Sequence, residues 1–359
     1  MFKKIILKNF RGFKNFESPL TPITIFGGKN NSGKSSLLEA ILFVFSHHDP
    51  NCFFQMNFLR HMNDQPLFTP ERLWEPLFYN FDTNQKLSII LENNDTVNNE
   101  LVLQKNLTTS SNNESNVNDV KNTFIQTGTA VFNYPLQFTY QSENIVESGN
   151  YSIFNNAVNI NYTSKNEKNT AKFKIVLIFK PETMMSANLL AQWFGQLVLN
   201  DKKELIIKAL QVFDKNIFDV QTIVKGAFGY LYVSFADGRK MPLSYMGDGI
   251  NRMLNMLLGI MSAPDGVVLI DEMENGFHYS MYQKIWEILS KAAVENNCQL
   301  IINTHSWDLL NGAVQGLENN NLADKLSYVR LDNQNNIIKA HIFDSSLIEF
   351  AVKSEMEVR

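Results

Sequence analysis

The sequence contains few cysteines and no long apolar run. Its two cysteines, Cys52 and Cys298, lie far apart in a chain of 359 residues and lack the spacing of metal ligands. We therefore expect two free thiols in a reducing cytoplasm rather than a disulfide framework. No segment approaches the roughly 18 consecutive apolar residues of a membrane span, so we expect no membrane attachment. The N-terminal apolar run is interrupted at Phe10 and Arg11 and no small-residue cleavage site follows it, which argues against a signal peptide.

An excess of positive charge is also absent. The chain carries 32 Lys and Arg against 36 Asp and Glu, which gives a formal net charge of −4. Proteins that coat a nucleic-acid backbone are usually basic, so the overall charge does not indicate nucleic acid, although a local basic face stays open. With 44% hydrophobic residues and no internal repeat, the chain can bury one large core or two modest ones.

The residues around position 28 have the pattern of a phosphate-binding loop. Residues 3–10 and 23–28 predict strands on either side of a short turn at 11–13. A glycine-rich loop follows the second strand, and a helix follows the loop. The apolar face of this helix consists of Leu37, Leu38, Ile41, Leu42 and Phe45. The order of strand, loop and helix is the one that a phosphate-binding loop needs.

The loop itself satisfies the pattern G-x-x-x-x-G-K-[ST] from Gly28 to Ser35. Backbone N–H groups of the loop would surround phosphate, Lys34 would reach the β- and γ-phosphates, and the Ser35 hydroxyl would bind Mg²⁺. The sequence therefore predicts ATP and Mg²⁺ as cofactors. The predicted nucleotide-binding residues are Gly28, Lys29, Asn30, Asn31, Ser32, Gly33, Lys34, Ser35 and Ser36.

Two acidic residues end a later apolar strand, "GVVLIDE". Asp271 would hold Mg²⁺, and Glu272 would orient or deprotonate the attacking water. His305, just past the next apolar strand, can hydrogen-bond the γ-phosphate. Asp271 follows Ser35 by 236 residues, far more than in a compact GTPase or nucleoside kinase, so we expect a long insertion between the two halves of the site.

The middle of the chain has weaker patterns. Residues 86–107 predict a hairpin, and the Asn-rich stretch 93–122 predicts a mobile surface loop. Further strands are predicted at 172–180 and 230–238. Residues 201–220 contain an amphipathic helix that we expect to end near Asp214–Asn216.

The last third alternates strands and helices. A helix is predicted after Asp248, and a helix at 279–296 lies between apolar strands at 266–272 and 298–306. This β-α-β pattern predicts a parallel sheet buried on both faces. Before it, "PLSYMGDGINRML" (242–254) places a serine and two glycines at a helix start, which resembles a second anion-binding N-terminus.

These motifs in this order resemble the ABC-type ATPase head of the SMC, RecF and OLD families. They are most similar to the single-chain, OLD-like AAA-domain ATPases of bacterial anti-phage and abortive-infection systems. The likeness includes the opening "ILKNFRGFKNF", the Walker A loop, the signature segment 242–254, the Walker B and D-loop segment "VVLIDEMENGFHYSM", the histidine switch "QLIINTHSWDLL" and a closing hairpin at 326–343. It implies an α/β P-loop NTPase of ABC-ATPase type. Its mixed or parallel sheet core would carry an antiparallel β subdomain and the long insertion between Walker A and Walker B.

The resemblance also implies an organisation and a set of site residues. We expect an N-terminal lobe (1–50), an inserted β/helical region (51–200) and a C-terminal lobe (201–359). Two heads would pack head to tail, so that the signature of one closes on the γ-phosphate held by the other. Signature residues acting in trans are Ser244, Gly247, Asp248 and Gly249, and D-loop residues at the interface are Asn275, Gly276 and His278. Glu272 and His305 would be catalytic, Ser35 and Asp271 would hold the metal, and Arg11 would approach the nucleotide.

The function that follows is a cytoplasmic, Mg-dependent ATPase whose ATP-driven dimerisation, or higher homo-oligomerisation, switches an effector in anti-phage defence. OLD proteins carry a C-terminal nuclease domain, but only residues 306–359 follow His305, so we expect a nuclease or toxin to act as a partner chain. A RecF-like DNA clamp in repair and an ATP-bound scaffold with little turnover are alternatives, and nucleic acid stays an open partner. The signature-like segment disfavours a sugar or nucleoside kinase. No long heptad pattern indicates an SMC-type coiled-coil arm.

Overall fold

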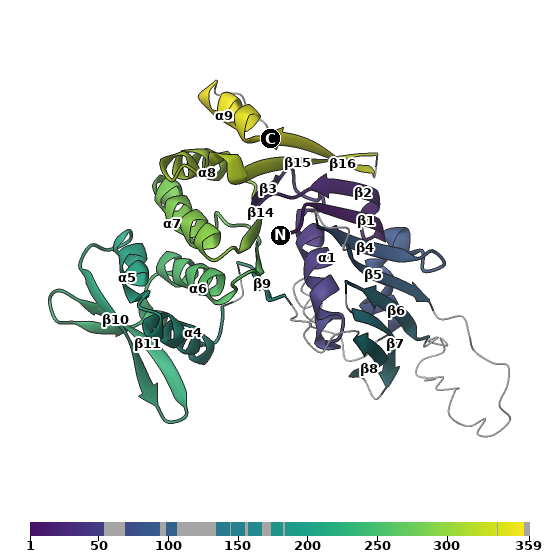
Figure 1. The fold of residues 1–359 in the computed structure, drawn as a ribbon, viewed down its shortest axis with the longest axis horizontal. Coiled ribbons are helices and arrows are strands. Elements are labelled where there is room, and N and C mark those ends of the chain that lie inside the picture. Colours follow the sequence, from purple (N-terminus) through teal and green to yellow (C-terminus); the bar gives the residue numbers. More distant parts are fainter. Residues whose placement is uncertain are drawn as a thin grey trace, which may run out of the picture.

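The computed structural model contains three β-sheets with helices between and around them (Figure 1). It describes residues 1–53, 69–93, 98–105, 134–143, 145–154, 157–166, 174–181, 184–335 and 337–354. Two extensive hydrophobic cores account for most of the buried apolar side chains in these ranges.

A six-stranded sheet has the strand order β16-β15-β3-β14-β13-β9. Its strands are β3 (Ile23–Gly27), β9 (Val176–Phe179), β13 (Val267–Ile270), β14 (Gln299–Asn303), β15 (Leu326–Gln334) and β16 (Ile337–Asp344). All neighbours are parallel except β15 and β16, which form the predicted closing hairpin. The predicted parallel sheet is thus confirmed, and the carboxyl ends of β3, β9, β13 and β14 meet at one edge.

A seven-stranded antiparallel sheet has the order β2-β1-β4-β5-β6-β7-β8. Its strands are β1 (Lys4–Phe10), β2 (Phe13–Pro19), β4 (Leu87–Glu92), β5 (Asn98–Lys105), β6 (Leu136–Gln141), β7 (Ile145–Phe154) and β8 (Ala157–Asn166). The β4–β5 pair confirms the predicted hairpin. Two expectations were wrong. The turn at 11–13 leads into β2, which pairs with β1. Residues 98–105 of the predicted Asn-rich loop form a strand, and residues 94–97 and 106–122 of that loop lie outside the described residues.

Helix α1 (Lys34–Ser46) lies between these two sheets and contacts strands of both (Figure 1). This position explains why it is more apolar than the predicted one-sided face. Ala40, Phe43 and Val44 are buried in addition to most of that face, because the helix has a sheet on either side. Its N-terminus points to the edge where β3 and β14 end.

Three helices and a small sheet form a lobe beside the six-stranded sheet, at the left of Figure 1. It contains α4 (Ala187–Leu199), α5 (Lys203–Gln211), α6 (Asp248–Ser262) and a three-stranded sheet of β10 (Ile217–Lys225), β11 (Phe228–Phe235) and β12 (Lys240–Pro242). The helix expected to end near Asp214–Asn216 ends at Gln211, since the Asp214 carboxylate accepts hydrogen bonds from the backbone N–H and side chain of Asn216 and forms a turn. The strand expected at 230–238 is β11.

Helices α7 (Tyr282–Glu295), α8 (Trp307–Asn319) and α9 (Ser345–Lys353) complete the C-terminal part, and α7 confirms the predicted helix between β13 and β14. Shorter helical turns are α3 (Pro70–Leu73), η1 (Glu75–Leu77), η2 (Tyr79–Phe81), η3 (Leu243–Tyr245), η4 (Tyr279–Met281) and η5 (Ala323–Lys325). Both cysteines are free and buried. Of the helices that can be described, none is long and apolar enough to cross a membrane.

Candidate nucleotide site

The phosphate-binding loop connects β3 to α1 with a backbone that only certain residues can adopt. Gly28 has φ +125°, and a Cβ there would lie 2.3 Å from the carbonyl oxygen of Leu331 on β15. Gly33 begins α1 in a left-handed conformation with φ +95°. The glycines of the motif therefore set the shape of the loop, and the first turn of α1 directs its free N–H groups toward the loop.

Lys34 is buried and folded back over this loop. Its Nζ donates hydrogen bonds to the carbonyl oxygens of Gly28 (2.8 Å) and Lys29 (2.9 Å). Burial lowers the pKa of Lys34 to about 8, an effect that the charges of Asp271, Glu274 and Glu272 partly oppose. A cation held by two carbonyls inside a phosphate loop can exchange those partners for phosphate oxygens.

Asp271 lies at the end of β13, opposite the start of α1. Its Oδ1 accepts hydrogen bonds from Ser35 Oγ (3.2 Å) and from Asn303 Nδ2 (3.1 Å). Its backbone N–H donates to the carbonyl of Phe179 on β9. Two elements thus hold the carboxylate and a third holds the backbone of Asp271. Asn303, at the end of β14, is a site residue that the sequence did not indicate.

Glu272 occupies a sharp turn with φ +47°, a conformation that is uncommon for a residue other than glycine. Arg252 of α6 stabilises this turn, since its guanidinium donates to the carbonyl oxygens of Asp271 (2.9 Å) and Glu272 (2.8 Å). Burial lowers the pKa of Arg252, although the guanidinium stays charged. The Glu272 carboxylate accepts a hydrogen bond from Asn275 Nδ2 (2.7 Å) of the D-loop. Arg252 is a second residue that the motifs did not reveal.

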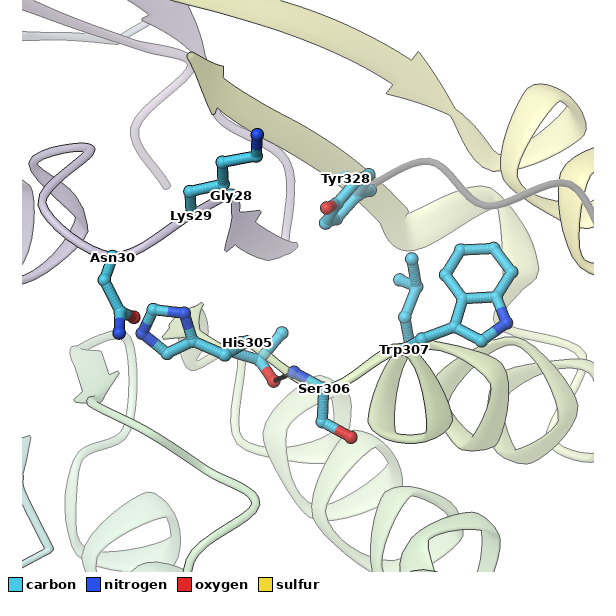
Figure 2. A pocket seen from close by; sticks show the side chains of 9 residues that line it. Gly28, Lys29, Asn30, His305, Ser306, Trp307 and Tyr328 are labelled. Atoms are coloured by element: carbon cyan, nitrogen blue, oxygen red, sulfur yellow. Dashed lines mark hydrogen bonds between the residues drawn. The ribbon is translucent and has the colours of Figure 1, made fainter. Parts of the chain in front are cut away.

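His305 follows β14 in a loop that Glu274 clamps. The two carboxylate oxygens of Glu274 accept hydrogen bonds from the backbone N–H of His305 (2.7 Å) and from Thr304 Oγ1 (2.8 Å). Figure 2 shows the exposed imidazole of His305 directed toward the side chain of Asn30 in the phosphate loop. The predicted sensor and the predicted phosphate loop therefore face each other.

One cavity of about 450 Å³ brings most of these residues together. Its lining consists of Asn30, Asn31, Ser32, Gly33, Lys34, Ser35, Ser36, Glu39, Lys180, Pro181, Asp271, Glu272 and His305. Gly28 and Lys29 line an adjoining cavity that shares Asn30 and His305. The predicted phosphate, metal and catalytic residues thus lie at one site although they come from distant parts of the sequence.

Lys180 is a buried cation in this cavity that the sequence analysis missed. It follows β9, whose last residue, Phe179, pairs with Ile270, so Lys180 emerges beside Asp271. Its Nζ lies 3.5 Å from Glu39 on α1, and burial lowers its pKa against the opposing charges of Glu39 and Asp271. Arg11 forms a buried ion pair (3.1 Å) with Glu39, which lines the cavity; Arg11 is not itself among the described lining residues.

The predicted signature lies elsewhere on the chain. Ser244, Gly247 and Asp248 are exposed at the start of α6, and none of the four signature residues is among the described residues that line the phosphate cavity. Gly249 packs against the D-loop of the same chain, because a Cβ there would lie 2.6 Å from the carbonyl oxygen of Gly276. Asn275, Gly276 and His278 are exposed beside it. Within one chain the four signature residues therefore lie outside the phosphate cavity, whereas Asn275 of the D-loop contacts that cavity through its hydrogen bond to Glu272.

The donor set of the cavity fits a magnesium nucleotide. Ser35 Oγ and Asp271 Oδ1 form a neighbouring pair of oxygens of the kind that Mg²⁺ prefers, and Mg²⁺ commonly takes only one or two protein ligands beside phosphate and water. Elsewhere, the described part of the chain contains no group of three or more His, Cys, Asp and Glu residues that could hold a metal ion.

The fold and this site define a P-loop NTPase with the architecture of an ABC-type ATPase head. The chain belongs to the family described as "AAA domain, putative AbiEii toxin, Type IV TA system", whose profile matches residues 23–311.

Two relatives share about a quarter of the aligned residues with this chain. The chain is 25% identical over 342 residues to a Helicobacter pylori protein named ATP/GTP phosphatase, an alignment that covers 86% of each chain. It is 28% identical over 100 residues to an uncharacterized protein of Methanocaldococcus jannaschii, which covers 28% of this chain and 88% of that protein. Among solved structures, the SMC head domain from Thermotoga maritima aligns with 96% of this chain and 99% of its own, at 12% identity and a TM-score of 0.46.

Proposed function

We propose that this protein is a Mg-dependent ATPase whose ATP-driven dimerisation switches a partner effector in bacterial anti-phage defence. The observation that carries the proposal is the single cavity that gathers Lys34, Ser35, Asp271, Glu272 and His305. The name of the Helicobacter pylori relative, ATP/GTP phosphatase, supports hydrolysis of a nucleoside triphosphate.

Each residue of the cavity would have its own role in ATP hydrolysis. Ser35 and Asp271 would hold Mg²⁺, which would neutralise negative charge on the β- and γ-phosphates. Lys34 would leave the carbonyls of Gly28 and Lys29 and bind the same phosphates. Glu272, held in place by Asn275, would orient a water molecule and accept its proton, while His305 would contact the γ-phosphate.

Dimerisation would complete the site. Ser244, Gly247 and Asp248 are exposed and lie outside the phosphate cavity of their own chain, so a second copy would supply them. A symmetric pair of chains uses the same surface twice and would create two equivalent sites. This arrangement makes bound ATP the link that holds the two chains together.

The role in defence follows from the family rather than from the geometry of the site. The family description names a putative AbiEii toxin and a type IV toxin–antitoxin system, which supports a role in abortive infection. The OLD-like character and the nuclease or toxin partner are proposed from the resemblance of the motifs. We expect such a partner to co-purify with the protein from its native cytoplasm, and co-purification with DNA-repair proteins would instead favour the RecF-like clamp.

The test uses Glu272→Gln, which keeps the size of the side chain and an acceptor for Asn275. We expect ATP hydrolysis, measured by phosphate release, to fall by about 10²–10⁴-fold, because the proton acceptor is lost. The variant should still bind ATP and elute as a dimer or larger oligomer with Mg-ATP. Lys34→Ala should bind little nucleotide and stay monomeric. Hydrolysis by Glu272→Gln at the parent rate would refute the assignment of the base, and a strict monomer would refute the head-to-tail arrangement.

A further inference from the structure

A second cavity adjoins the phosphate cavity on the other side of Asn30 and His305. It has a volume of about 290 Å³ and is open between the phosphate loop, the start of α8 and β15 (Figure 2). The side chains that determine the polarity of its lining are those of Lys29, Asn30, His305, Trp307, Leu310 and Tyr328. Since Asn30 and His305 also line the phosphate cavity, these two side chains form a shared wall.

The two ends of this second cavity differ in chemistry. Trp307 and the ring of Tyr328 make one end aromatic, while Lys29, Asn30 and His305 make the other end polar (Figure 2). Leu310 adds apolar surface to the lining. A dry apolar cavity of about 150 Å³ admits benzene in another protein, so this one is large enough for an aromatic side chain. A ring with a hydroxyl group matches both ends.

The signature segment carries such a side chain. Tyr245 directly follows Ser244 on η3, and it is 77% exposed. Exposure of a large aromatic next to a predicted interface is typical of a residue that a partner covers, because aromatic side chains dominate the energy of protein interfaces. Its own chain leaves this ring in solvent.

We propose that Tyr245 of one copy inserts into the second cavity of another copy when ATP closes the dimer. The inference rests on the proposed function, in which Ser244 reaches the terminal phosphate of the partner chain. Consecutive Cα atoms are only about 3.8 Å apart, so the residue after Ser244 lies beside the wall of Asn30 and His305 that separates the two cavities. Each chain contains both the ring and the cavity, as a symmetric interface requires.

This insertion would connect dimer closure to the γ-phosphate sensor. A ring packed behind Asn30 and His305 would restrict both side chains to the phosphate side of the wall. Tyr245 would therefore act as a positioning residue for His305, and each chain would complete the sensor of the other.

Photocrosslinking tests the contact directly. p-Benzoylphenylalanine at position 245 in the Glu272→Gln background keeps an aromatic ring and reacts with groups that it touches. A mixture with isotopically labelled Glu272→Gln protein distinguishes crosslinks between chains from those within one chain. We expect an ATP-dependent crosslink between chains that maps to residues 304–310 or to Tyr328, and none with Lys34→Ala as the partner. The same photocrosslinker at Phe218 (70% exposed, on β10) should give no crosslink to this cavity.

A binding measurement provides the matched control. Tyr245→Ala in the Glu272→Gln background should weaken the ATP-dependent dimer by about tenfold or more, and Tyr245→Phe should retain most of the affinity because it keeps the ring. Both variants should unfold at the denaturant concentration of their parent, since the side chain is exposed.

The outcomes separate this inference from the proposed function. A dimer that forms normally while position 245 crosslinks elsewhere overturns the insertion and leaves the ATPase dimer intact. A crosslink to the cavity from position 279, where Tyr279 is 65% exposed, with none from 245, also overturns it. A failure of the Glu272→Gln protein to dimerise with ATP overturns the head-to-tail arrangement and the insertion together.

Discussion

The two halves of the proposed nucleotide site differ in how completely one chain builds them. In the phosphate half, Lys34 and Asp271 are buried. Lys34 donates two hydrogen bonds to carbonyls of the phosphate loop, and Asp271 accepts hydrogen bonds from Ser35 of α1 and Asn303 of β14. In the signature half, Ser244, Tyr245 and Gly247 are exposed. The fold of one chain therefore preorganises the phosphate half, whereas in our proposal a second chain is needed to complete the signature half.

A glycine-to-alanine substitution should change the unfolding free energy far more in the phosphate half than in the signature half. Gly28→Ala forces an unfavourable φ of +125° and places a Cβ 2.3 Å from the Leu331 carbonyl oxygen, and strain and overlap each cost about 1–3 kcal/mol. We expect a loss of about 4 kcal/mol of unfolding free energy, measured by urea denaturation, and a loss of ATP binding. Gly247→Ala should change stability by less than about 0.5 kcal/mol, because its φ of −59° suits alanine and no atom lies within 4 Å of the added Cβ.

A measurement of ATP-dependent dimerisation tests the signature half, where Gly247→Ala is expected to have an effect. Gly247→Ala should bind ATP normally and yet weaken ATP-dependent dimerisation, because its surface would pack only in the closed dimer. If Gly247→Ala destabilised the monomer as strongly as Gly28→Ala, the signature half would be as preorganised as the phosphate half, and the contrast would be lost.

The contrast also explains how much of the site could be predicted from the sequence. Gly28–Ser35 form a continuous motif, and Asp271, Glu272 and His305 follow apolar strands whose carboxyl ends must meet at one edge of a parallel sheet. Lys180 also directly follows an apolar strand, but the sequence does not indicate that β9 pairs with β13, because the two strands are separated by almost 90 residues. A search for charged residues directly after every apolar strand would have found it.

Other residues depended on packing that no sequence pattern specifies. Arg252 reaches the Glu272 turn because α6 packs beside β13, and Asn303 faces Asp271 because of the register of β14. Arg11, which is expected near the nucleotide, forms an ion pair with Glu39 of the cavity lining. The fold was predicted best from residue 248 onward, where strands and helices alternate regularly. It was predicted worst in the antiparallel sheet, because β1 and β2 precede α1 in the sequence and the other five strands follow it.

Arg252 connects the two halves and gives the second prediction. Arg252→Met keeps an unbranched, flexible stem but leaves the carbonyl oxygens of Asp271 and Glu272 without their guanidinium donor. We expect a loss of about 2–3 kcal/mol of unfolding free energy by urea denaturation, together with slower ATP hydrolysis, because the Glu272 turn is no longer held.

A matched arginine provides the control for this experiment. Arg239 forms an exposed ion pair with Asp237, so Arg239→Met should cost less than about 1 kcal/mol and leave hydrolysis unchanged. Equal effects of the two substitutions on stability and hydrolysis would show that Arg252 of α6 does not support the Glu272 turn.

The smallest effect is a pH dependence that comes from Lys34 of the phosphate half. Burial lowers the pKa of Lys34 to about 8, and the ammonium form is the one that attracts phosphate. ATP would stabilise this charged form, so the affinity should be constant below pH 8 and should fall as Lys34 loses its proton above it. The loss of one proton changes the ATP affinity by at most tenfold per pH unit. We therefore expect about tenfold weaker binding at pH 9 than at pH 7, or about 1.4 kcal/mol.

Calorimetric titration of ATP into Glu272→Gln measures this change without turnover. Lys34→Arg in the same background should bind with little change between pH 7 and pH 9, because arginine keeps its charge throughout that range. A parent protein whose affinity stayed constant to pH 9.5 would show that Lys34 remains charged, and that its carbonyl partners compensate for its burial before any nucleotide binds.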